Sequence, residues 1–196
     1  MNDILEEKQI ENLTIRIMPD EFPDNPRDWD NLGKMVCFHN HYTFPKEVEI
    51  YSDDYNSWDE MERDIIRKYG ASVILPIYLY DHSGLAFSVN SFHGRLPQGH
   101  AEFDSGRIGF IFITKKNIRK EYGKVGKKEI EEAIKVLTNE VELYQKYANG
   151  ESYRFSIKDE DGEELDSCGG FFSIEDAMNE AEGQANYLVM EHKEKL

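Results

Sequence analysis

The sequence predicts an α+β fold, with a mostly antiparallel sheet, three or four helices packed on it, and a single domain. Strand-like apolar segments separated by tight turns recur along the chain, and longer stretches repeat apolar residues at helical spacing. A length of 196 residues suits one domain, and 39% hydrophobic residues are enough for a folded core. We therefore expect a flexible leader, residues 1–12, followed by one domain, residues 13–196.

Seven segments show the alternation, or the short continuous apolar run, that is typical of strands. They lie at residues 13–18, 34–39, 73–80, 85–89, 108–114, 153–158 and 163–168. Residues 81–84 link the third segment to the fourth, and residues 159–162 link the last two. Both links contain glycine and polar turn residues, so each pair is expected to form an antiparallel hairpin.

Capping residues and apolar periodicity predict the helices. Ser57 and Glu60 form a capping box, and Gly70 can take the left-handed conformation that closes a helix. In the same way Thr114 precedes a short helix and Ser173 precedes the last one. The expected helices lie at residues 58–69, 115–122, 127–149 and from 174 onward.

The helix that begins at Lys127 has the clearest pattern in the chain. Its apolar residues recur at intervals of four and three positions, at Ile130, Ile134, Leu137, Val141, Tyr144 and Ala148. This spacing places them in one stripe along the helix, facing the core. Both Ile134 and Leu137 are therefore predicted to be buried.

Acidic residues dominate both ends of the chain, which has a net charge of −16. An acidic surface repels nucleic acid and attracts basic surfaces. Closely spaced carboxylates can imitate a phosphate backbone and occupy arginine and lysine sites on a partner, or they can serve solubility alone. The candidate partner-binding residues are Asp24, Asp28, Asp30, Asp53, Asp54, Asp159, Glu160 and Asp161.

A basic run lies between the acidic ends. It consists of Lys115, Lys116, Arg119, Lys120, Lys124, Lys127 and Lys128. Lys116, Arg119 and Lys120 have the spacing that places them on one side of a helix. Such a cluster can bind the phosphates of a nucleic acid, or it can pair with the acidic blocks of the protein itself.

The histidines are the candidate catalytic residues. Five of the six lie between residues 39 and 100, at His39, His41, His82, His93 and His100. Two histidines brought together can act as general acid and general base in phosphodiester cleavage, and in an enzyme we expect His39, His82 or His93 in these roles. Metal binding with Asp81 or Asp104 is an alternative, as are ordinary surface roles. Because no recognised ligand spacing occurs, we expect no metal and no cofactor.

The two cysteines and the hydropathy pattern limit the location of the protein. Cys37 and Cys168 lack the spacing of a thiolate metal site, so both are expected to be buried thiols. No segment approaches the ~20 apolar residues of a membrane span, and the acidic N-terminus does not have the pattern of a signal peptide. We expect a cytoplasmic protein without membrane contact.

Four long motifs resemble a poorly characterised family of proteins from bacteriophages and mobile elements of Gram-positive bacteria. They are PRDWDNLGKMVCFH (26–39), PIYLYDHSG (76–84), GRIGFIFITKKNIRKEYG (106–123) and YRFSIKDEDGEELDSCGGFF (153–172). The resemblance covers roughly residues 13–180 and assigns no catalytic residues. It implies a role against host defence, for which anti-CRISPR and antirestriction proteins are the natural comparison.

These features lead to two functional hypotheses. The first is an inhibitor of a nucleic-acid-directed host defence system, of the anti-CRISPR kind, whose partner is a host protein or ribonucleoprotein with a basic channel and whose basic helix touches RNA. The second is an enzyme that cleaves or modifies RNA or a nucleotide signal by histidine acid–base chemistry.

Overall fold

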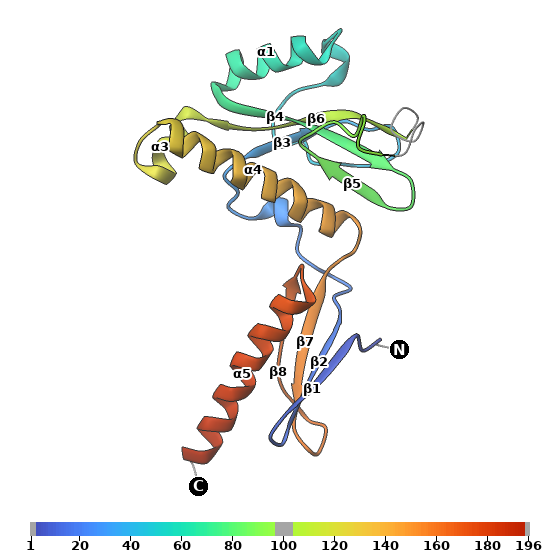
Figure 1. Cartoon of the computed structure of the whole chain (residues 1–196), viewed down its shortest axis with the longest axis vertical. Coiled ribbons are helices and arrows are strands. Elements are labelled where there is room, and N and C mark those ends of the chain that lie inside the picture. The colour runs from blue at the N-terminus through green and yellow to red at the C-terminus, as the bar shows by residue number, and fades with distance from the viewer. Residues whose placement is uncertain (1–2, 97–103, 195–196) are drawn as a thin grey trace. The chain divides into compact units, whose positions relative to one another are not determined.

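A computed structural model describes residues 3–96 and 104–194 (Figure 1). It contains two four-stranded antiparallel sheets and has an α+β fold, so the predicted fold class is confirmed. The elements are β1 (Glu6–Ile10), β2 (Leu13–Pro19), the 3-10 helix η1 (Pro26–Asp28), β3 (Lys34–Cys37), the 3-10 helix η2 (Ser52–Asp54), α1 (Trp58–Tyr69), β4 (Ala71–Asp81), β5 (Leu85–Ser88), β6 (Ser105–Thr114), α3 (Lys115–Tyr122), α4 (Lys127–Ala148), β7 (Tyr153–Lys158), β8 (Glu164–Phe171) and α5 (Ile174–Glu194).

The chain divides into two compact units, where the sequence predicts one domain. Unit 1 comprises the residues up to 25 and those from 146 onward, and unit 2 comprises residues 26–145. Each unit has a hydrophobic core of its own. Apolar periodicity indicates which residues are buried but not which partner covers them, so it does not distinguish one core from two.

Unit 2 has three layers. Its sheet has the order β3-β6-β4-β5, with α1 on one face and α3 and α4 on the other (Figure 1). Phe110 and Phe112 of β6 pack against Met61 and Ile65 of α1. The alternating Ile111 lies on the opposite face and is also fully buried. The continuous apolar run of β6 therefore results from helices that cover both faces of the sheet.

Unit 1 has two layers, a sheet of order β1-β2-β7-β8 and the helix α5 packed on it (Figure 1). Small buried side chains at Ala177, Ala181 and Ala185 allow the helix to approach the sheet closely. Strand β1 lies within the predicted flexible leader and pairs antiparallel with β2. Its sequence, EEKQI, has no apolar alternation, and four of its five residues are exposed. Backbone pairing with β2, rather than burial of side chains, therefore holds this edge strand in place.

The helix caps follow the sequence closely. The Ser57 hydroxyl accepts a hydrogen bond from the backbone N–H of Glu60 at 3.2 Å, and Gly70 closes α1 with φ +68°. Thr114 and Ser173 accept equivalent bonds at the starts of α3 and α5. Caps are local in sequence, so the residues that form them are recognisable without tertiary structure.

Two predictions of burial are wrong. Ile134 is 37% exposed, while its neighbour Ala133 is fully buried. Successive residues are about 100° apart around a helix, so Ile134 lies at one edge of the stripe, and the buried face is centred toward the other edge, where Ala133 lies. Cys37 is buried as expected, but Cys168 is exposed on the edge strand β8.

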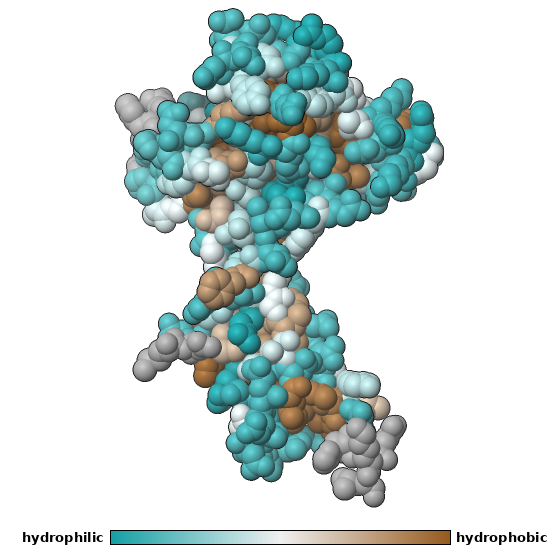
Figure 2. Space-filling model, turned by 180° about the vertical axis from the view of Figure 1, so that it is seen from behind, coloured by the Kyte–Doolittle hydropathy of each residue, from teal (hydrophilic) through white to brown (hydrophobic). Residues whose placement is uncertain are grey.

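No helix in the described part of the chain is long and apolar enough to cross a membrane. Hydrophilic side chains cover most of the face shown in Figure 2, as expected for a protein with 32% charged residues.

Gly109 of β6 lies so close to β3 that a side chain there would collide with backbone. A Cβ atom at this position would lie 2.0 Å from the carbonyl oxygen of Val36 and 2.8 Å from the Cα atom of Cys37. We expect Gly109→Ala to lower the unfolding free energy by about 1–3 kcal/mol or more, because paired strands would have to separate.

The matched control is Gly106→Ala on the same strand, where a Cβ atom would meet nothing within 4 Å. The two tryptophans, Trp29 and Trp58, both lie in unit 2, so tryptophan fluorescence during urea denaturation follows the unfolding of this unit. Equal midpoints for the two variants would contradict the close approach of β3 and β6.

Candidate functional site

Three strands of unit 2 place polar residues at one end of the sheet. Strands β3 and β4 both run antiparallel to β6, so both end where β6 begins. Backbone hydrogen bonds continue beyond the strands, from the N–H of Phe38 to the Ile108 carbonyl at 2.7 Å and from that of Asp81 to the Asp104 carbonyl at 2.9 Å. These bonds hold the segments that follow β3 and precede β6 in place.

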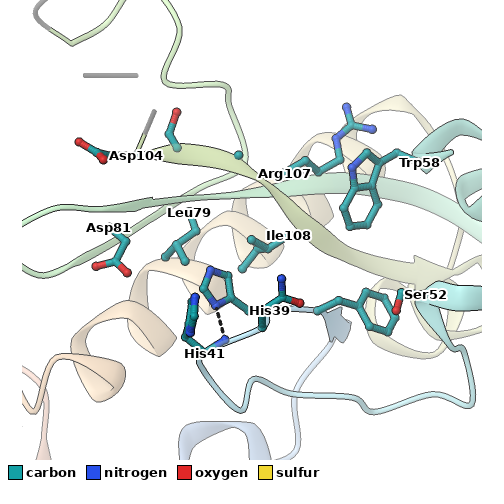
Figure 3. Close-up of a pocket in the computed structure, with 13 residues that line it drawn as sticks. His39, His41, Ser52, Trp58, Leu79, Asp81, Asp104, Arg107 and Ile108 are labelled. Atoms are coloured by element: carbon teal, nitrogen blue, oxygen red, sulfur yellow. Dashed lines mark hydrogen bonds between the residues drawn. The ribbon is translucent and has the colours of Figure 1, made fainter. Parts of the chain in front are cut away.

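A pocket of about 610 Å³ lies at this end of the sheet (Figure 3). Residues 38–41 after β3, Leu79 and Asp81 of β4, and residues 104–108 of β6 and its approach contribute to its wall. Ser52 of η2 and Trp58 at the start of α1 complete it. Aromatic, cationic, carboxylate and imidazole groups thus converge from five segments that are distant in sequence.

The pocket contains two of the candidate histidines. His39 and His41 both line it, and the Nδ1 atom of His39 accepts a hydrogen bond of 3.2 Å from the backbone N–H of His41 (Figure 3). In the neutral ring this bond leaves the proton on Nε2. The His39 ring also packs near Tyr42 and Phe44, with centroid distances of 5.0 and 5.7 Å. An imidazole fixed in one orientation is suited to binding or to proton transfer.

The other candidate histidines are placed differently. The Nδ1 atom of His82 lies 3.3 Å from a carboxylate oxygen of Asp104, which itself lines the pocket. His93 is exposed in a turn and does not line the pocket. His100 lies outside the described residues. The structure therefore brings His39 together with His41, rather than His39 with His93.

Hydrogen bonds orient the remaining polar groups of the pocket. The hydroxyl of Tyr42 donates to a carboxylate oxygen of Asp81 at 2.8 Å. This bond raises the pKa of Tyr42 above its ordinary value, because the bonded hydroxyl holds its proton more tightly. Arg107 donates to the hydroxyl of Tyr78 at 3.0 Å, and its guanidinium lies over the Tyr78 and Phe110 rings.

Within residues 3–96 and 104–194, no group of three or more histidine, cysteine, aspartate or glutamate side chains could hold a metal ion. Asp81 and Asp104 are the candidate partners of a histidine-bound metal. Asp81 instead accepts a hydrogen bond from the hydroxyl of Tyr42, and a carboxylate oxygen of Asp104 lies 3.3 Å from the Nδ1 atom of His82. The expectation of no metal and no cofactor stays a prediction.

The seven residues of the basic run are all exposed, but they fall into two groups. Lys124 and Lys127 form ion pairs with Glu129 and Glu131, at 3.5 and 4.0 Å. None of the described ion pairs involves Lys128 or the four cations of α3, Lys115, Lys116, Arg119 and Lys120. Pairing with the protein's own acidic residues thus accounts for part of the run and not for α3.

The acidic candidates are also divided. Asp28, Asp30, Asp53 and Asp54 are exposed in unit 2, whereas Asp24, Glu160 and Asp161 are exposed in unit 1. Asp159 has a structural role, because its carboxylate accepts hydrogen bonds from the backbone N–H groups of Asp161 and Glu163 and so stabilises the β7–β8 turn.

Arg107 and Trp58 are pocket residues that the sequence does not point to. In the sequence, Trp58 looks like the first residue of an amphipathic helix. Arg107 looks like an ordinary polar residue that precedes a buried strand. Only the strand register and the position of α1 against Phe110 bring the two residues to one pocket.

Comparisons with protein-family models, curated proteins and solved structures find no match to this chain.

Proposed function

We propose that the protein is a phage-encoded inhibitor of a host nucleic-acid-directed defence system, of the anti-CRISPR kind, which binds an effector nuclease or its guide RNA in the host cytoplasm through charged surfaces. The observation that carries the proposal is the set of four exposed cations on α3 without an ion pair among the described residues. The phage context comes from the sequence motifs within residues 13–180 alone, since the comparisons with known proteins find no match.

The arrangement of charge on α3 is unfavourable without a bound anion. Lys115 and Lys116 lie in the first helical turn, which contains no acidic residue. Cations in the first turn oppose the helix dipole, and like charges at i and i+4, as at Lys116 and Lys120, repel each other. A phosphate backbone would relieve both effects.

The acidic surfaces supply a second kind of contact. Asp53 and Asp54 lie together on η2 and are exposed, as are Glu160 and Asp161 at the β7–β8 turn. Carboxylates at such short intervals complement a basic channel on a protein that binds nucleic acid. The proposed inhibitor would use these residues to occupy protein sites and α3 to touch RNA.

The test reverses the charge of α3. Replacing Lys115, Lys116, Arg119 and Lys120 by glutamate is expected to weaken binding to a single-stranded RNA oligonucleotide or to an RNA-guided effector by at least about tenfold. It should also reduce the slope of log affinity against log salt by up to about three, roughly 0.7 for each phosphate of a single strand that α3 no longer neutralises. Fluorescence anisotropy measures both quantities.

The control reverses four exposed lysines that lie outside the basic run and already form ion pairs, Lys8, Lys34, Lys135 and Lys193. Net charge changes equally in both variants, so only the location of the change differs. Circular dichroism shows whether each variant is folded. Equal losses of affinity in the two variants, or unchanged binding in a folded α3 variant, would contradict the proposal.

A second candidate function is favoured by the pocket, where His39 and His41 lie on one wall. Histidines at this position suit an enzyme that cleaves or modifies RNA or a nucleotide. Stoichiometry separates the two functions. An inhibitor that works by occupancy saturates near one protein per effector and leaves the RNA intact, whereas an enzyme acts at lower ratios and shortens or alters the RNA on a gel.

A further inference from the structure

We propose that the pocket at the end of β3, β4 and β6 binds a nucleotide, with its phosphate at Arg107, its base against Trp58, and its sugar hydroxyls toward Asp81 and Asp104. The site is the pocket of the second candidate function, for which this proposal names the ligand class, and it is separate from α3, which carries the proposed inhibitor function. The pocket lies where β6 begins, whereas α3 follows directly after β6 ends at Thr114.

Neighbouring aromatic residues orient the guanidinium of Arg107 and leave most of its donors available for an anion. Its Nη2 atom donates to the hydroxyl of Tyr78 at 3.0 Å, and its guanidinium carbon lies 5.4 and 5.6 Å from the centroids of the Tyr78 and Phe110 rings. No described ion pair joins Arg107 to a carboxylate, in a protein with 39 acidic residues. A guanidinium has five donors in a rigid fork that matches phosphate oxygens, so most of them remain for a ligand.

Trp58 provides an aromatic surface in the same part of the pocket. The Trp58 ring packs edge-on against Phe110, with centroids 5.9 Å apart and an interplanar angle of 72°. Phe110 is therefore in contact with both Trp58 and Arg107. An aromatic ring beside an arginine suits a nucleobase with an attached phosphate, because stacking on aromatic side chains is how proteins bind unpaired bases.

Two carboxylates, Asp81 and Asp104, line another part of the pocket wall, away from Arg107 and Trp58 (Figure 3). Tyr42 donates to Asp81, and His82 lies 3.3 Å from Asp104, so partners outside the ligand space orient both groups. Carboxylates accept hydrogen bonds from hydroxyl and amino groups but repel a second phosphate. The pocket therefore favours a ligand with one anionic end and one hydroxyl-bearing end.

A nucleoside monophosphate has these three features, and a volume of about 610 Å³ is within the range of small-molecule sites. A free monophosphate and a single nucleotide of an RNA strand share the same chemistry. Inorganic phosphate lacks the ring and the hydroxyls, and a nucleoside lacks the anion. Both should therefore bind more weakly than the complete nucleotide.

The experiment titrates the full chain by isothermal calorimetry with AMP, GMP, CMP and UMP, with the matching nucleosides, with inorganic phosphate and with a short single-stranded RNA. At least one monophosphate should bind tenfold or more tightly than its nucleoside and than phosphate. Binding to monophosphates with no gain for RNA assigns the site to a free nucleotide, and tighter binding to RNA assigns it to a strand. Absence of binding to all four monophosphates and to RNA would overturn the proposal.

Substitutions in the pocket test whether the ligand binds there. Arg107→Gln should lower the affinity for the monophosphate by about 10–100-fold, since hydrogen bonds to charged groups have effects of this size. Arg154→Gln, on β7 of unit 1, is the control and should leave the affinity unchanged. Trp58→Leu should also weaken binding and keeps the test decisive if Arg107→Gln does not fold.

The reversed-charge α3 variant should bind the monophosphate as tightly as the unaltered chain does. A weaker affinity there would show that α3 binds the nucleotide and that the pocket does not. Loss of RNA binding through α3 with normal binding of monophosphate would separate the two proposals. Unchanged affinity in a folded Arg107→Gln variant would refute the pocket assignment.

Discussion

Replacement of Arg27 by Leu is expected to lower the unfolding free energy by about 3–5 kcal/mol, the largest single effect anticipated in this chain. The Arg27 side chain is only 3% exposed, and its partners Glu47 and Glu140 are 16% and 10% exposed. Removing the guanidinium leaves the largely buried Glu140 without a described ion pair, and leaves Glu47 with only Lys34, whose Nζ atom lies 3.8 Å away. Such a change costs far more than the pair itself contributes.

The hydrogen bonds of Arg27 connect four segments of unit 2. Its Nε atom donates to Glu47 at 2.6 Å, Nη1 to Glu140 of α4 at 2.9 Å, and Nη2 to the Gly33 carbonyl at 2.9 Å. Glu140 in turn accepts a hydrogen bond from the backbone N–H of Leu32 at 2.8 Å. The loop before β3 is thereby fastened to α4, and removing Arg27 should loosen both.

Two opposing effects act on the pKa of Arg27. Burial alone would lower the pKa, but the hydrogen bonds and negative charges of Glu47 and Glu140 outweigh burial and raise it above the ordinary value. A cation whose pKa is raised by folding stabilises the fold below its unfolded pKa and loses this effect only at strongly alkaline pH. The effect of Arg27→Leu should therefore be constant across neutral pH.

The matched control is Arg67→Leu. Arg67 pairs with Asp64 on the surface of α1 in the same unit, and its side chain is 83% exposed. Exposed pairs contribute about 0–1 kcal/mol. Urea denaturation followed by tryptophan fluorescence measures both variants, and a decrease below about 1 kcal/mol for Arg27→Leu would contradict a buried structural role.

The sequence predicts well those features that depend on neighbouring residues. The capping box at Ser57, the basic helix after Thr114 and the β7–β8 hairpin all appear where local patterns place them. Arg27 could not be recognised in this way. It lies in a proline-rich acidic segment typical of a surface loop, and its partner Glu140 is 113 positions away.

The candidate pocket was predictable only in part, for the same reason. His39 was a candidate because a histidine is chemically versatile wherever it occurs. Arg107 and Trp58 gain their roles from strand register and helix packing, which no local pattern encodes. The division into two compact units could not be read from the sequence either, because the partner of each apolar face is a property of the tertiary structure.

Leu137→Ala is expected to lower the unfolding free energy by about 2–5 kcal/mol, the second large effect. Leu137 lies on α4 and is fully buried. Its Cδ2 atom is so close to Gly33 that a Cβ atom there would lie only 2.3 Å away. Truncation to alanine removes this packing and leaves a cavity between α4 and the sheet, which the surrounding backbone can fill only in part.

Ile134→Ala on the same helix is the decisive comparison. Helical spacing assigns Ile134 and Leu137 to the same apolar stripe, yet Ile134 is 37% exposed. Its truncation should therefore lower the unfolding free energy by less than about 1 kcal/mol, since exposed substitutions have small effects. Similar decreases at the two positions would mean that α4 is rotated so that Ile134 faces the core, as the periodicity alone predicts. A large decrease at Leu137 alone would show that tertiary packing, and not the spacing of apolar residues, decides which side of α4 is buried.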